Sequence, residues 1–100
     1  MNDLDATRLC AEAMGFPNVH IATACRGTQY VKHTSRSITA NTEYRPLHDD
    51  AQAFALVKRF PMQTLPAMEA WIRTNAVHEL NRCIVYTVAV MQKEREMNSP

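Results

Sequence analysis

The chain has 100 residues, of which 46% are hydrophobic and 21% are charged, and 11 basic residues nearly balance 10 acidic ones. This composition is typical of one small globular domain over residues 1–100. The length excludes a dinucleotide-binding domain joined to a substrate domain, and it excludes a large enzymatic barrel. The formal net charge of +1 argues against a polybasic protein of the histone kind.

An amphipathic helix is predicted over residues 3–14. Apolar residues recur there at positions i, i+3, i+4 and i+7, which is the spacing of one helix face. Asn2 or Asp3 can cap the first turn, and Gly15 permits the left-handed backbone that often ends a helix. These signals mark both ends of the element.

A β-hairpin is predicted next. Alternating side chains after Pro17 indicate a strand within residues 19–25, and Arg26 with Gly27 is suited to a turn. Residues 28–34 have high strand propensity and supply the second strand. The polar segment 35–44 indicates an edge strand or a loop.

A second helix is predicted between His48 and Pro61, where helical spacing returns. Asp49 and Asp50 suit its N-terminus, since negative charge is favourable there, and Pro61 is expected to end it. Residues 67–73 alternate in polarity, which predicts a strand with at least one covered face.

A long apolar C-terminal helix is predicted from Thr74 or Asn75 to about Met97. Residues 84–90 are rich in β-branched side chains and by propensity alone could form a buried strand. Helical spacing continues over four turns, however, and both ends are charged. We therefore expect the central core helix here. The resulting fold class is α+β, with a small antiparallel sheet packed with three helices.

Two stretches carry a resemblance to a known family: residues 44–57, YRPLHDDAQAFALV, and residues 82–91, RCIVYTVAVM. They resemble the phage ABA-sandwich domain family, in which an aromatic-x-Pro segment, a turn with Asp and an Ala-rich helix precede a strand with Trp and an Ala/Ile-rich helix. The Trp is Trp71 here. The resemblance implies a phage or prophage origin and an α+β sandwich. It implies no activity, because the family is largely without assigned function.

Groups that could carry catalysis are few. His48, Asp49 and Asp50 could bind a metal or act as acid and base, but neighbouring residues at a helix start point in different directions, and a capped N-terminus is the simpler interpretation. The three cysteines and four histidines show neither Cys-x-x-Cys nor His-x3-His spacing. We predict no catalytic residue, no metal site, no cofactor and no enzymatic activity.

Residues 26–45 form a basic segment with interleaved aromatic side chains. On a hairpin or edge strand it could meet phosphate groups or an acidic protein surface, or it could simply protect the sheet edge from aggregation. Trp71 could anchor an interface or cover the core. The predicted partner-binding residues are Arg26, Tyr30, Lys32, Arg36, Tyr44, Arg45 and Trp71.

These observations favour stoichiometric binding. Together with the resemblance to phage proteins, they predict an inhibitor of a host defence system that binds an effector protein, as anti-CRISPR proteins do. The alternative is a nucleotide- or nucleic-acid-binding protein, such as a sponge for a signalling nucleotide, that clamps phosphate with the same arginines. A homodimer is also expected, because a small domain has little surface with which to bury so apolar a helix.

The host cytoplasm is the expected location. The first residues lack the basic-then-apolar pattern of a signal peptide, and the number of cysteines is odd. The longest strongly apolar run, residues 83–91, is about half the roughly 20 residues that cross a membrane. We expect no membrane partner.

Overall fold

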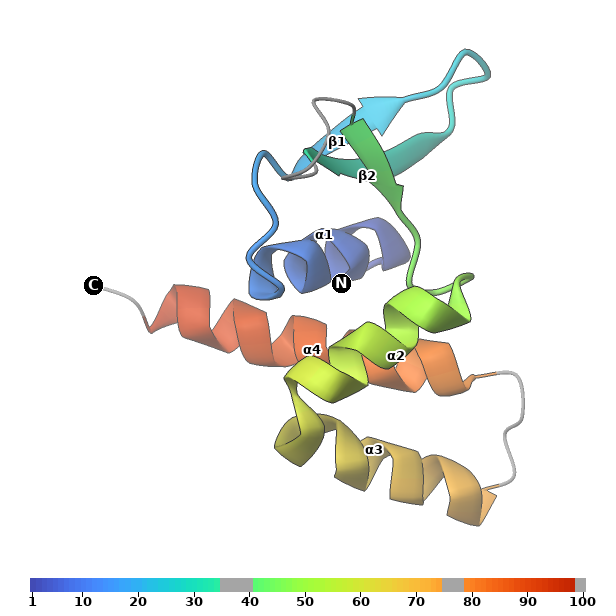
Figure 1. The fold of residues 1–100 in the computed structure, drawn as a ribbon, viewed down its shortest axis with the longest axis vertical. Coiled ribbons are helices and arrows are strands. Elements are labelled where there is room, and N and C mark those ends of the chain that lie inside the picture. The colour runs from blue at the N-terminus through green and yellow to red at the C-terminus, as the bar shows by residue number, and fades with distance from the viewer. Residues whose placement is uncertain (35–40, 75–78, 99–100) are drawn as a thin grey trace.

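A computed structural model describes residues 1–34, 41–74 and 79–98 of the chain. This part of the chain contains a three-stranded antiparallel sheet and four helices, so the α+β class is confirmed, although three helices were expected. The sheet lies at one end of the molecule, and α3 lies at the other (Figure 1). The elements in chain order are α1 (Asp3–Ala13), β1 (His20–Thr23), β2 (Gln29–Thr34), β3 (Asn41–Tyr44), α2 (Asp50–Arg59), α3 (Pro61–Thr74) and α4 (Leu80–Met97).

The local signals at both ends of α1 act as predicted. The Asn2 side chain accepts a hydrogen bond from the Asp5 N–H at 2.8 Å, which caps the N-terminus. After the helix, Gly15 adopts a φ of 76°, and the N–H groups of Gly15 and Phe16 donate to carbonyls of the last turn. This is a Schellman ending, and the positive φ is why glycine stands there.

The predicted hairpin is confirmed as β1 and β2. β3 pairs with the other edge of β2, so the strand order is β1-β2-β3 and Val31 lies between Ile21 and Tyr44. Of the segment 35–44, residues 41–44 form this edge strand and residues 35–40 lie outside the described chain. Val31 and Tyr44 are buried on the side of the sheet that α1 covers (Figure 1).

The predicted strand over residues 67–73 is wrong, because this segment belongs to α3. The alternation in polarity is also compatible with a helix whose inner face carries Thr64, Met68 and Trp71, at i, i+4 and i+7. Pro61 starts this helix, since proline suits a first helical position where no N–H partner is needed. Phe60 alone separates α2 from α3.

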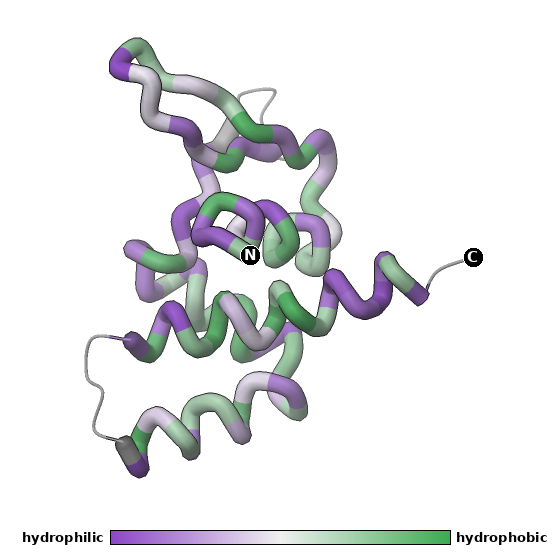
Figure 2. The backbone as a smooth tube through the Cα atoms, turned by 180° about the vertical axis from the view of Figure 1, so that it is seen from behind, coloured by the Kyte–Doolittle hydropathy of each residue, from purple (hydrophilic) through white to green (hydrophobic). Residues whose placement is uncertain are grey.

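The structure corrects the prediction of a long apolar C-terminal helix, both in where the helix begins and in how apolar it is. α4 begins at Leu80, whereas Thr74 ends α3 and Asn75 lies outside the described residues. The helix is amphipathic. Its buried face consists of Ile84, Val85, Val88 and Ala89. Val90 is 47% exposed, and Figure 2 shows the last turns as hydrophilic.

The described helices include none that combines the length and the apolar character required to cross a membrane.

The core is built around α4, which contacts α1, α2 and α3. Small side chains on α1, Ala6 and Cys10, are fully buried, and the Cys10 thiol donates to the Val85 carbonyl at 3.1 Å. Small residues at a helix contact let the two backbones approach closely. The buried core residues are Ala6, Leu9, Cys10, Ala11, Val31, Tyr44, Leu56, Ile84, Val85, Val88 and Ala89.

An exposed cluster also joins α1 to α4. The Arg82 guanidinium lies 2.9 Å from the Asp3 carboxylate, and the Tyr86 hydroxyl donates to the same carboxylate. Arg82 also lies over the Tyr86 ring, with its guanidinium carbon 4.7 Å from the ring centroid. Exposed ion pairs contribute little stability, so burial between the helices dominates this contact.

We predict that Leu56→Ala lowers the free energy of unfolding by about 2–5 kcal/mol, because Leu56 is fully buried and its loss leaves a cavity. Leu65→Ala is the matched control, since Leu65 is exposed, and its change should stay within about 0.5 kcal/mol. Urea unfolding followed by circular dichroism measures both. Equal effects of the two substitutions would contradict the described packing.

Candidate binding surface

The structure distributes the predicted partner-binding residues over separate places. Tyr44 is in the core, Trp71 is on α3, and Arg36 lies outside the described residues. The remaining four lie in the sheet or next to it: Arg26, Tyr30, Lys32 and Arg45. Arg26 is exposed in the turn between β1 and β2, and Arg45 is exposed directly after β3.

Glu43, the one acidic residue in the segment 26–45, lies close to two of its basic residues. Lys32 pairs in register with Glu43 on the neighbouring strand, and the Arg45 Nε lies 3.7 Å from the Glu43 carboxylate. The Lys32 ammonium also lies 5.3 Å from the centroid of the Tyr30 ring. A carboxylate beside two cations weakens the attraction of both for a phosphate.

The prediction that Tyr44 contacts a partner is corrected by its burial. Tyr44 is 3% exposed, and its ring lies edge-on to Phe16, with a centroid distance of 5.3 Å. Phe16 in turn stacks on His33 at 4.1 Å. Burial raises the pKa of the Tyr44 hydroxyl above its ordinary value. The alternation of side chains along a strand explains this placement, because Val31, His33 and Tyr44 share the covered face.

Among the described groups, the Tyr44 hydroxyl finds no hydrogen-bond partner. We predict that Tyr44→Phe raises the free energy of unfolding by about 1–3 kcal/mol, because it removes an unsatisfied buried polar group without changing the ring. Chemical denaturation of the two proteins provides the measurement. Tyr30→Phe serves as the control, since Tyr30 is only partly buried. A loss of stability on Tyr44→Phe would show that the hydroxyl is bonded.

Trp71 cannot join the basic segment in one surface. It lies on α3, at the end of the molecule opposite the sheet (Figure 1). The strand with Trp that the family resemblance implied is therefore a helix here. Trp71 is partly buried, on the helix face that also carries the buried Thr64 and the partly buried Met68. Its position fits the alternative in which it covers the core.

The acidic residues after His48 are part of a helix start, as the simpler interpretation predicted. The Asp49 carboxylate accepts a hydrogen bond from the Gln52 N–H at 3.1 Å and caps α2. Asp50 accepts one from the Asn81 side chain at 2.9 Å, and His48 is exposed. Over residues 1–34, 41–74 and 79–98, no group of three His, Cys, Asp or Glu side chains is placed to hold a metal ion.

The cysteines occupy three different environments. Cys10 is buried, and burial raises the pKa of its thiol to about 12, so it is neutral and unreactive at physiological pH. Cys25 is exposed on the hairpin, and Cys83 is partly buried on α4. No two of them form a disulfide.

Three large exposed apolar side chains lie on α3, a surface that the sequence analysis missed. Met62 is 80% exposed, Leu65 is 55% exposed and Ile72 is 63% exposed. Spacings of three and seven residues place them on one side of the helix. We call these three residues the α3 stripe. Reading residues 67–73 as a strand concealed this periodicity, although the spacing is present in the sequence.

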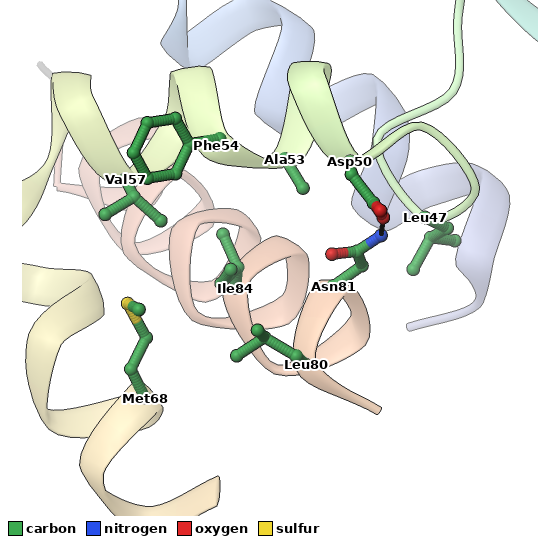
Figure 3. A pocket seen from close by; sticks show the side chains of 9 residues that line it. All are labelled: Leu47, Asp50, Ala53, Phe54, Val57, Met68, Leu80, Asn81 and Ile84. Atoms are coloured by element: carbon green, nitrogen blue, oxygen red, sulfur yellow. Dashed lines mark hydrogen bonds between the residues drawn. The ribbon is translucent and has the colours of Figure 1, made fainter. Parts of the chain in front are cut away.

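A groove of about 500 Å³ lies beside the stripe, between α2, α3 and α4 (Figure 3). The side chains of Phe54, Met68 and Ile84 border it, and the hydrogen bond from Asn81 to Asp50 lies among the lining residues. The α3 stripe adjoins the groove, because Leu65 and Ile72 are at i−3 and i+4 from Met68. The lining residues are Leu47, Asp50, Ala53, Phe54, Val57, Met68, Leu80, Asn81 and Ile84.

Comparison of the chain with protein-family models, with curated proteins and with solved structures finds no match.

Proposed function

We propose that this protein acts by stoichiometric binding of another protein and that the α3 stripe is its contact surface. The observation that carries this proposal is the exposure of Met62, Leu65 and Ile72 on one side of one helix. Exposed apolar side chains on one face are typical of a helix that docks into a groove of its partner. The exposed Glu69 lies on this face between Leu65 and Ile72.

The energetic basis is the removal of these side chains from water. A large aliphatic side chain contributes about 1.5–3 kcal/mol when it becomes fully buried. The residues of the stripe are more than half exposed, so most of that gain is still available to a partner. The adjoining groove would add apolar contact area through Phe54 and Met68.

The resemblance to phage ABA-sandwich proteins extends the proposal to the identity of the partner. Under this extension, the partner is an effector protein of a bacterial defence system, and binding inhibits it by covering a functional surface. An inhibitor that acts by covering a surface of its target needs no catalytic group. The sequence contains few groups suited to catalysis, and this agrees with inhibition by binding alone.

The nucleotide-binding alternative receives less support from the described residues. It relied on the arginines and lysine of the segment 26–45 as phosphate clamps. Glu43 lies beside Arg45 and pairs in register with Lys32, so a bound phosphate would meet a carboxylate as well as the cations.

We predict that Ile72→Glu reduces partner capture at least tenfold, because a charge in an apolar contact must be desolvated. Val90→Glu is the matched control, since Val90 is 47% exposed on α4, away from the stripe, and should capture partners as the unchanged chain does. Tagged chains are incubated with bacterial lysate, and the bound proteins are quantified by mass spectrometry. Circular dichroism verifies that both variants are folded.

Equal capture by the unchanged chain and Ile72→Glu would contradict the assignment of the surface. Recovery of a nucleotide in parallel extracts, with no protein, would favour the alternative function.

A further inference from the structure

A second exposed surface lies on α2, where an acidic, an aromatic and a basic side chain follow one another at equal spacing. Asp50, Phe54 and Lys58 are four residues apart, so they form one ridge along the helix. Phe54 is 55% exposed, and Asp50 and Lys58 are exposed as well. We call these three residues the α2 ridge. The buried residues of α2 are Ala53 and Leu56, of which Leu56 lies opposite the ridge and Ala53 lies beside it.

The charges of the ridge are placed at equal distances from its centre. Each charged residue is four positions from Phe54, which corresponds to about 6 Å along a helix axis. A twofold axis through Phe54 reverses the direction of the helix. The axis therefore places Asp50 of each copy opposite Lys58 of the other copy. It also places the two Phe54 rings against each other.

We propose that two copies of this chain associate through a twofold, antiparallel contact of their α2 ridges, centred on Phe54. In a twofold interface the same surface meets itself, so a ridge with only one sign of charge would repel its copy. The order acid, aromatic, base is complementary to itself. The net charge of +1 adds little repulsion between whole molecules.

Within one chain, the Asp50 carboxylate accepts a hydrogen bond from the Asn81 side chain at its Oδ1, and Asp50 is still exposed. The Lys58 ammonium lies 5.2 Å from the centroid of the Phe54 ring, so the cation is held beside the centre of the ridge. Ala51, the exposed residue between Asp50 and Phe54, has no side chain beyond Cβ and allows close approach of a second helix. One helix face is a small interface, so the dimer dissociates on dilution.

This contact differs from the self-association predicted from the sequence, which was expected to bury the apolar C-terminal helix. The apolar residues of that helix, Ile84, Val85 and Val88, are buried against other elements of the same chain. Their burial therefore requires no second copy of the chain. An order of side chains that is complementary to itself brings no advantage in binding an unrelated partner, whereas it stabilises a twofold contact, and this favours a second copy as the occupant.

The test is sedimentation of the full chain over a range of concentrations. We expect the average mass to rise from the 11.4 kDa of one chain towards twice that value. Phe54→Ala should keep the mass at the monomer value. Asp50→Lys alone and Lys58→Asp alone should each raise the dissociation constant at least tenfold, because each brings like charges into opposition. Lys93→Asp, at an exposed site on α4, is the control and should leave it unchanged.

A mixture of the two charge-reversed variants gives the decisive measurement. Each single variant repels its own copy, but in the mixed pair every reversed charge meets an opposite one, so association should return to the level of the unchanged chain. Misfolding of either variant would not be repaired by mixing. A chain that stays monomeric at all concentrations, or a mixture that stays monomeric, would overturn the proposal.

The α2 ridge and the α3 stripe share no residue, although Phe54 also borders the groove beside the stripe. Self-association is measured without a partner, and Ile72 lies outside the ridge, so the two proposals can fail separately.

Discussion

The close packing of α1 on α4 is the contact on which the rest of the structure depends. Ala6 and Cys10 are fully buried on α1, Ala89 is fully buried on α4, and the Cys10 thiol donates to the Val85 carbonyl of α4. α1 then supports the sheet on its other side, while α2 and α3 cover further sides of α4 (Figure 1). The sheet is held mainly by α1, and the α2–α3 pair is held mainly by α4. The Gln52 side chain of α2 also links the two parts, because it donates to the Glu43 carbonyl and accepts from the Arg45 N–H.

The parts of the fold that were predictable are those with local signals. The cap at Asn2, the positive φ at Gly15 and the cap at Asp49 all mark boundaries that the sequence specifies within a few residues. α3 lacked such signals. Pro61 is compatible with ending one helix and with starting another, and the alternation of residues 67–73 fits a strand as well as a helix with a narrow buried face. Packing against α4 decides between them, and packing is not visible in a short window of sequence.

The candidate surface was less predictable than the fold, because it depends on which side of each element faces outward. Strand register places Tyr44 on the covered face of the sheet and pairs Glu43 with Lys32. Counting the basic residues of the sequence reveals neither of these placements. The α3 stripe was hidden for a related reason. The predicted strand began at residue 67, so it included Ile72 and left Met62 and Leu65 outside, and the helical spacing of the three residues was not seen. Arg26 and Arg45 are exposed, as a contact surface requires, whereas Tyr44 is buried.

The connection between α2 and α3 has a consequence for any binding at these helices. Phe60 is the only residue between them, its carbonyl accepts from the N–H and the hydroxyl of Thr64, and Pro61 restricts the backbone that follows. The short connection therefore holds the backbones of the two helices in a fixed arrangement before any contact forms. Association at this pair incurs little loss of backbone entropy. Its heat-capacity change should reflect the apolar area buried between finished surfaces, without the larger contribution that accompanies folding upon binding.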